Sequence, residues 1–202
     1  LKIYEDYDKT ERIVYGVDPA KNDDVLNKEK RIYMLSQMDG KIPETMPYQI
    51  TFRMLTTLLQ IYSGDVDAVI KSLGDVKPEQ EETLRQRAQC AWYWITESAP
   101  DCAPDFCFAL ITDGSKSDKI EGDYLKALCR IRAEVVPKLE TFAVDKELQQ
   151  AMYDIATEMG LDAKSLFQTV YTALIGKLQG PRLANFMKII GKDQLSKILS
   201  VY

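Results

Sequence analysis

The sequence contains no histidine. This absence excludes a Ser–His or Cys–His nucleophile pair and any histidine general base. Cysteine is also scarce, with four residues at Cys90, Cys102, Cys107 and Cys129. Their spacing includes none of the C-x-x-C pairs that hold structural zinc, and no imidazole is present to complete a mixed site. We therefore expect reduced, packed thiols rather than a metal site or disulfides.

Membrane and nucleotide-binding signals are missing as well. No apolar run approaches the roughly 18 residues that a membrane helix requires, and no basic and then apolar leader opens the chain. We find no glycine-rich nucleotide-binding loop. With 46% apolar and 28% charged residues in 202 positions, the composition is typical of a folded protein with one large domain or two small ones. The sequence predicts a cytoplasmic protein without a membrane partner, and an independent enzyme is the function that it supports least.

What the sequence does contain is an uneven distribution of charge. Residues 163–202 hold six basic side chains against one acid, a net charge of +5, whereas the whole chain has a net charge of −5. Residues 1–162 must then carry a net charge of −10. An acidic chain with one short basic end indicates an anionic partner at that end, and a phosphate backbone is the first candidate.

Helical periodicity dominates from Thr51 onward. Apolar residues recur at helical spacing, and glycine follows each of three consecutive expected helices, at 146–159, 163–175 and 181–190. The connections between these helices are short, so neighbouring helices must pack closely. The sequence predicts an all-α helical bundle, in which Arg31–Leu35 is the one stretch whose residue types favour a short strand.

Prolines mark the expected boundaries. Pro43 and Pro47 interrupt any helix between the N-terminal segment and the helical part of the chain. Further along, one helix should run to Pro100, and Pro137 should end or kink the next. We expect an entry or linker segment over residues 1–47, a first helical subdomain over 48–142 and a basic C-terminal subdomain over 143–202.

The most distinctive motif is the turn Gly180-Pro181-Arg182. Its proline suits the first position of a helix, whose free N–H groups would face an anion. Arg182 adds a fork-shaped donor suited to a phosphate or a base edge. Taken alone, the turn is better explained as a plain helix start with a solvated arginine. The neighbouring Lys177, Lys188 and Lys192 favour a contact surface instead.

Aromatic side chains offer a second kind of contact. Tyr171 lies on the helix that leads into the turn, where it can either stack on a base or pack in the core. Trp92, Tyr93 and Trp94 are candidates for a stacking platform, although adjacent aromatics on a helix are more often core and interface residues. Ser117 is best explained as the cap of a long helix.

Two stretches near the end carry a family resemblance. The sequence Leu174-Ile-Gly-Lys-Leu-Gln-Gly-Pro-Arg-Leu-Ala-Asn-Phe, followed by Ile190-Gly-Lys-Asp-Gln-Leu195, resembles the C-terminal end of the glutamyl-type and class I lysyl-tRNA synthetases. In that group a helix leads into a glycine, then Gly-Pro, then a helix that ends in Gly-Lys. Three upstream stretches are more similar to the class I, archaeal-type lysyl enzymes: Glu11-Arg-Ile-Val-Tyr-Gly16, Lys30-Arg-Ile-Tyr-Met-Leu-Ser36, and Ile42-Pro-Glu-Thr-Met-Pro-Tyr48 followed by Phe52-Arg53.

This resemblance implies an anticodon-binding region, an all-helical cage that grips the anticodon loop of a lysine tRNA. The parent enzyme would be an ATP-dependent lysine–tRNA ligase. The chain itself has neither the H-I-G-H nor the K-M-S-K-S signature of a catalytic domain, so it would not aminoacylate and would need no cofactor or metal of its own. Together with the charge pattern, the matching positions imply these RNA contacts: Tyr171, Lys177, Gly180, Pro181, Arg182, Leu183, Lys188 and Lys192.

Two alternatives stay open. One is the anticodon-binding domain of a glutamyl-tRNA synthetase, and the other is a helical protein-interaction module whose basic end meets an acidic partner. For a tRNA partner, lysines and helix N-termini would position phosphates, and the turn and aromatic faces would bind unstacked bases. We expect RNA rather than DNA.

Overall fold

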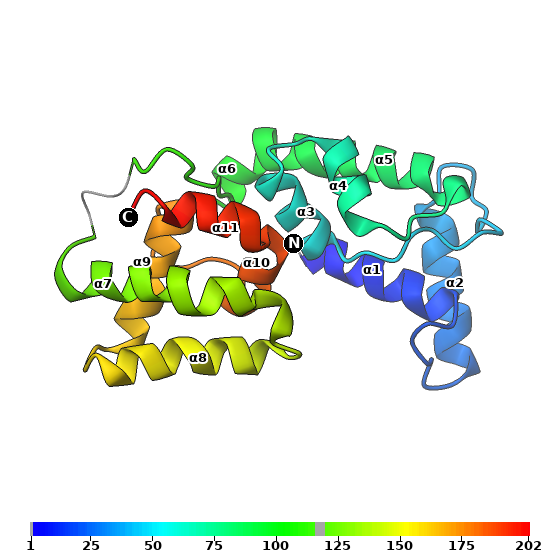
Figure 1. Ribbon diagram of the computed structural model, residues 1–202. Helices are drawn as coiled ribbons and strands as arrows, with labels where there is room; N and C mark the ends of the chain where they lie inside the picture. The colour runs from blue at the N-terminus through cyan, green and yellow to red at the C-terminus, as the bar shows by residue number, and fades with distance from the viewer. Residues whose placement is uncertain (1, 116–119) are drawn as a thin grey trace. The chain divides into compact units, whose positions relative to one another are not determined.

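The computed structural model describes residues 2–115 and 120–202, and within them every element of regular structure is a helix (Figure 1). The predicted all-α class is confirmed. The chain divides into two compact units, residues 1–102 and residues 103–202. The sequence-based boundaries after residues 47 and 142 fall inside these units, one in each. Ser117, the expected helix cap, lies outside the described residues.

The first unit consists of a helical hairpin and a group of helices that follow it. Its elements are α1 (Lys2–Val14), α2 (Asp23–Ser36), α3 (Phe52–Ile61), α4 (Val66–Leu73), α5 (Pro78–Tyr93), η1 (Trp94–Ser98) and α6 (Ala99–Cys102). Helix α1 packs against both α2 and α3, and α5 packs against α3 and α4. Leu55 and Leu59 on α3 are fully buried, because their helical spacing turns both toward the core.

The strand predicted at Arg31–Leu35 is wrong, because these residues form the end of α2. Asn22 starts this helix, since its side chain accepts a hydrogen bond from the Val25 N–H at 2.9 Å. Near its other end Tyr33 is only 1% exposed, and its hydroxyl donates to Glu11 on α1 at 3.0 Å. A contact with another helix therefore outweighs the local β preference of this stretch.

Two buried carboxylates on α1 link this helix to α3 and α5 in the first unit. Asp8 accepts the N–H of Phe52 at 2.6 Å, at the start of α3, and also pairs with Arg87 on α5. Glu11 accepts from the Gln49 amide at 3.0 Å and lies 3.9 Å from Arg87. Because buried charges need partners, Arg87 holds α5 in place against α1.

A π-helical turn, which is wider than an α-helical one, precedes a proline at two places. In η1 and in η3 (Ile131–Val135), the residue that follows the turn donates its N–H to the carbonyl five residues earlier, and a proline comes next. A proline ring crowds the carbonyl four residues before it, and the wider turn relieves this contact. The helix therefore continues through Pro100 to Cys102, contrary to the prediction that it would stop there. Before Pro137 the α-helix does end, as predicted, and a 3-10 helix follows.

The second unit is a bundle built around apolar side chains. Its elements are α7 (Gly122–Arg130), η3 (Ile131–Val135), η4 (Val136–Thr141), α8 (Asp145–Glu158), α9 (Ala163–Ile175), α10 (Leu183–Ile190) and α11 (Lys192–Leu199). Helix α9 crosses α7 and α8 and also packs against α11 (Figure 1). Leu128, Leu148 and Phe186 are fully buried, and the Phe186 ring meets Phe108 edge-on at 5.2 Å.

Helix α9 has the bounds that the sequence predicts. Asp162 caps its start by accepting the Ser165 N–H at 2.8 Å. Gly176 follows its end with a left-handed φ of +68°, and its N–H bonds to the Thr172 carbonyl at 3.0 Å. Glycine accepts this conformation without steric strain, so the chain can leave the helix and enter the turn toward α10.

Candidate functional site

The turn between α9 and α10 lies at the surface of the second unit. Residues 176–182 are exposed or half-buried, and Arg182 is exposed. The expected helix start at Pro181 is wrong, because α10 begins at Leu183 and Arg182 takes the capping position. No side chain caps this helix end. Pro181 therefore belongs to the extended approach to the helix, a conformation that its fixed φ also suits.

Tyr171 fixes the shape of this turn. Its hydroxyl donates a hydrogen bond to the Pro181 carbonyl at 2.5 Å. Burial raises the pKa of this hydroxyl, and a hydrogen bond from the Leu183 backbone N–H opposes the rise. Burial thus favours the protonated phenol, which is the form that donates this hydrogen bond. Tyr171 thus acts first as a support for the turn, whereas the sequence left base stacking and core packing open.

Gly180 passes close to the same ring. A Cβ at this position would lie 2.8 Å from the Ile175 Cδ1 atom and 3.1 Å from the Tyr171 Cε1 atom. Both distances are shorter than an ordinary van der Waals contact. A side chain at residue 180 would require Ile175, Tyr171 or the turn to shift, so glycine suits this close approach.

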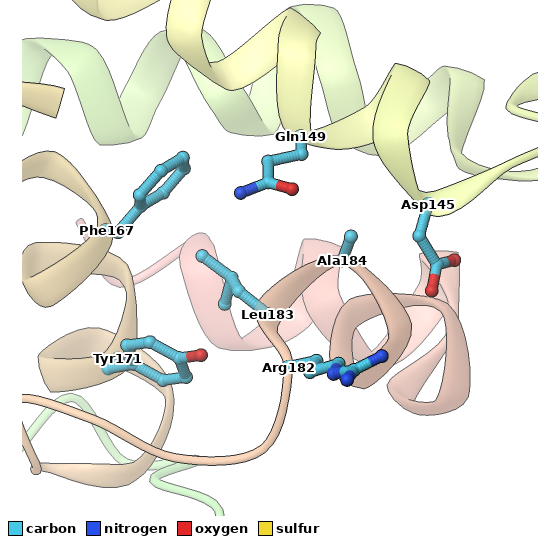
Figure 2. A pocket seen from close by; sticks show the side chains of 7 residues that line it. All are labelled: Asp145, Gln149, Phe167, Tyr171, Arg182, Leu183 and Ala184. Atoms are coloured by element: carbon cyan, nitrogen blue, oxygen red, sulfur yellow. The ribbon is translucent and has the colours of Figure 1, made fainter. Parts of the chain in front are cut away.

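An open pocket adjoins the turn (Figure 2). It has a volume of about 480 Å³ and lies between α8, α9 and the start of α10. The residues that line it are Asp145, Gln149, Phe167, Tyr171, Arg182, Leu183 and Ala184. Three of them, Tyr171, Arg182 and Leu183, are sequence-predicted site residues, and the structure brings them together here.

The other lining residues escaped the sequence analysis. Asp145 and Gln149 are four residues apart on α8, and Phe167 and Tyr171 are four apart on α9, so each pair shares one helix face. This spacing was visible in the sequence. What was not visible is that the two faces look toward one another, since that depends on how α8 and α9 pack.

The pocket combines apolar walls with polar side chains, two of which have no partner in the described part of the chain. Leu183 and Ala184 are buried, and the Phe167 ring meets Tyr153 at 4.9 Å with an interplanar angle of 87°. Gln149 and Arg182 are exposed, and neither forms a hydrogen bond or ion pair with the described part of the chain. Such a pocket can hold a flat ring and still offer hydrogen bonds to its edge.

The three predicted lysines have different surroundings. Lys177 donates from Nζ to the Pro104 carbonyl at 2.8 Å, and Lys188 Nζ lies 3.1 Å from an Asp145 oxygen. Lys192, the first residue of α11, is exposed and has no partner within residues 2–115 and 120–202. Arg182 and Lys192 are therefore the most accessible cations of this surface, while Asp145 offsets the charge of Lys188.

The consecutive aromatics of the first unit are engaged in packing. The Trp94 ring meets Phe52 and Tyr4 edge-on at 5.5 and 5.7 Å. Trp92 lies against Gly64, where an added Cβ would meet the indole at 2.3 Å. Tyr93 is the one of the three that is exposed, at 68%. The structure favours the core explanation for both tryptophans.

In residues 2–115 and 120–202, no cluster of three or more cysteine, aspartate or glutamate side chains could hold a metal ion. Cys107 and Cys129 are half-buried, whereas Cys90 and Cys102 are exposed, so the expectation of packed thiols is wrong for these two. Among the described helices, none is both long and apolar enough to cross a bilayer.

Comparisons with known proteins point to one family. A family model described as an anticodon binding domain matches residues 105–199, which is nearly the whole second unit. A lysine–tRNA ligase of Treponema pallidum is 44% identical over 203 residues, covering 100% of this chain and 37% of that protein. Lysine–tRNA ligases of Borreliella burgdorferi and Thermococcus kodakarensis are 36% and 32% identical and cover 100% and 98% of the chain. The chain spans less than two fifths of the length of these curated relatives, at 37–38%.

Proposed function

We propose that this chain belongs to the class I lysyl-tRNA synthetase family and that its second unit binds the anticodon loop of a lysine tRNA. One observation carries the proposal: the stretch that matches the anticodon-binding family, residues 105–199, also contains the exposed turn and the open pocket. The similarity to lysine–tRNA ligases over the full chain favours a lysine tRNA over a glutamate tRNA.

The accessible groups of the second unit suit a single-stranded RNA loop. Lys192 offers a cation for the phosphates, and Arg182 offers donors for a phosphate or a base edge. The pocket offers apolar walls and hydrogen-bonding groups for a base. Proteins usually recognise RNA loops in this way, with phosphates positioning the loop and unstacked bases providing sequence information. Of the predicted contacts, Gly180 and Pro181 would act through the backbone shape of the turn, Leu183 as a pocket wall, and Lys177 and Lys188 through their charge.

For the whole protein we propose lysine–tRNA ligation with ATP in the cytoplasm. The catalytic chemistry would belong to a part of the protein that this chain does not include, because the relatives are more than twice as long as the matched region. The contribution of this chain would be to select the correct tRNA and to hold it.

A titration with anticodon stem-loops tests the proposal. The chain is added to fluorescently labelled stem-loops that differ only in the anticodon, one for lysine and one for glutamate, and anisotropy is followed at two salt concentrations. We expect tighter binding of the lysine loop at both concentrations and weaker binding of both loops at high salt. Equal affinity for the two loops would refute recognition of the lysine anticodon.

An acidic protein or heparin serves as the competitor control. Either should displace the labelled loop only through charge, without distinguishing the lysine from the glutamate loop. If an acidic protein bound more tightly than both RNAs, the helical protein-interaction module would be the better explanation.

A further inference from the structure

The pocket beside the turn has the shape and chemistry of a site for one flipped-out base. We propose that it holds a single uracil of the lysine anticodon, stacked on Phe167 and hydrogen-bonded at its edge by Gln149 and Arg182. This inference rests on the proposed function and assigns a ligand to one pocket. Lysine codons begin with two adenosines, so base pairing requires uridines at the matching anticodon positions.

The walls of the pocket are suited to a flat ring. Phe167 points into the pocket from α9 (Figure 2). The Tyr153 ring meets the Phe167 ring edge-on at 4.9 Å. Leu183 lies across from Phe167 and is only 9% exposed. A base that enters between these two side chains would stack on an aromatic ring and cover an aliphatic one, which stabilises an unstacked base.

The polar groups of the pocket match the edge of uracil. Uracil presents an N–H donor with a carbonyl acceptor beside it. The Gln149 amide offers one acceptor and donors that can meet this pair, as amide side chains do with adenine in DNA. Arg182 has donors only, and it can satisfy a remaining uracil carbonyl. Neither side chain has to break a contact with the described part of the chain to do so.

The pocket walls favour a base over a phosphate as the occupant. The carboxylate of Asp145 lies on the wall, and its single charge is paired with Lys188 at 3.1 Å. Phe167 and Leu183 offer a phosphate no hydrogen bond, whereas a neutral base can stack on them. We therefore place the phosphates outside the pocket, along Lys192.

Two pocket variants and one matched control test the assignment. Phe167→Leu removes the stacking surface, and Gln149→Ala removes the amide. Gln150→Ala is the control, because Gln150 is the next residue on α8 and its amide bonds to Asp154 on the same helix at 2.8 Å. Each variant of the full chain is titrated with the lysine stem-loop and with three loops in which one anticodon nucleotide is abasic. Circular dichroism melts check that each variant is folded.

We expect Phe167→Leu to weaken binding of the intact lysine loop about tenfold or more, which is the loss expected for one stacked base. Gln149→Ala should weaken it about fivefold to tenfold, and Gln150→Ala should bind like the unchanged chain. One of the three abasic loops should bind the unchanged chain and the Phe167→Leu variant equally. That loop identifies the anticodon position that the pocket holds.

Two results would overturn the assignment while leaving the proposed function intact. In the first, the unchanged chain prefers the lysine loop, yet Phe167→Leu and Gln149→Ala bind as well as the control. In the second, both variants bind each of the three abasic loops more weakly by the same factor as they bind the intact loop. Such a result indicates a general loss of affinity and not the loss of a site for one base. If the unchanged chain shows no preference for the lysine loop, the proposed function and this assignment both fail.

Discussion

The two units differ in where they keep their polar side chains. In the part of the chain that the structure describes, the buried polar and charged residues all belong to the first unit: Asp8, Thr10, Glu11, Thr56, Thr57 and Gln60. The buried residues of the second unit are apolar, and its pairs such as Lys188–Asp145 and Arg130–Glu134 lie at or near the surface. The first unit thus uses charge to fix its own helices, whereas the second leaves charge free for a ligand.

This difference predicts how each unit responds to substitution. A buried network loses stability when one member is removed, because the remaining charge stays buried without compensation. Exposed polar groups such as Gln149 and Arg182 can be removed at little cost in stability. In the second unit, substitution of such exposed groups should therefore lower RNA affinity without lowering stability.

The comparison can be tested unit by unit, because both tryptophans lie in the first. Trp92 and Trp94 make tryptophan fluorescence a signal of that unit, while far-UV circular dichroism reports helices throughout the chain. Substitutions in either unit can be followed by these two signals and by RNA binding.

Phe186→Ala should cause the largest loss of folding stability. Phe186 is 0% exposed and packs edge-on against Phe108, so truncation opens a cavity in the apolar core of the second unit. We expect a destabilisation of about 4 kcal/mol, visible as an early loss of circular dichroism in urea. The tryptophan signal should keep its midpoint, and a parallel shift of both signals would show that the two units do not unfold separately.

Arg87→Ala should affect the other unit. Its removal leaves Asp8 and Glu11, whose side chains are 10% and 4% exposed, without a cation. We expect a loss of about 3 kcal/mol in the first unit, seen in the tryptophan midpoint. Arg85→Ala is the control, because Arg85 on the same helix pairs with the surface carboxylates Asp67 and Glu81 and should matter little. Similar losses for the two variants would contradict the importance of burial.

Arg182→Ala should weaken RNA binding without affecting either unfolding signal. The side chain is exposed, so we expect the lysine stem-loop to bind about 1 to 3 kcal/mol less tightly, the usual value of a specific base contact. Lys164→Ala also removes one cation from the basic stretch, but at the opposite end of α9 from the turn. If anisotropy titrations gave the same loss for both variants, Arg182 would contribute charge alone.

Tyr171→Phe should have the smallest effect of the four. It removes the hydroxyl that bonds to the Pro181 carbonyl and keeps the ring against Gly180. We expect a destabilisation of about 1 kcal/mol in the second unit and a modest loss of lysine-loop affinity. Tyr153→Phe is the matched control, since Tyr153 is 39% exposed. An unchanged melt and unchanged affinity would show that the turn holds its shape without this hydrogen bond.

Much of the second unit could be predicted from sequence because its signals are local. The bounds of α9 follow from Asp162 and Gly176, which cap the two ends of the helix with their own side chain and backbone. The strand predicted at Arg31–Leu35 failed for the opposite reason, since the contact that decides it joins Tyr33 to Glu11, 22 residues away. Local propensity carries no information about such a partner.

The site was predicted in part for the same reason. The family resemblance, together with the charge pattern, pointed to Tyr171, Arg182 and Leu183, which do meet at one pocket. They did not locate Gln149 and Phe167, because those residues reach the pocket only through the packing of α8 on α9. The start of α10 was misplaced by two residues, because Pro181 suits an extended approach as well as a first helical turn.

The close fit of Gly180 against Tyr171 and Ile175 limits how this surface can change. A side chain at position 180 would require Ile175 or the loop to move, and a movement of the loop would carry Arg182 and Leu183 with it. Gln149 and Phe167, by contrast, line the open pocket, away from this close contact. A protein engineer who wished to alter the preferred nucleotide would therefore vary the pocket walls and keep the glycine.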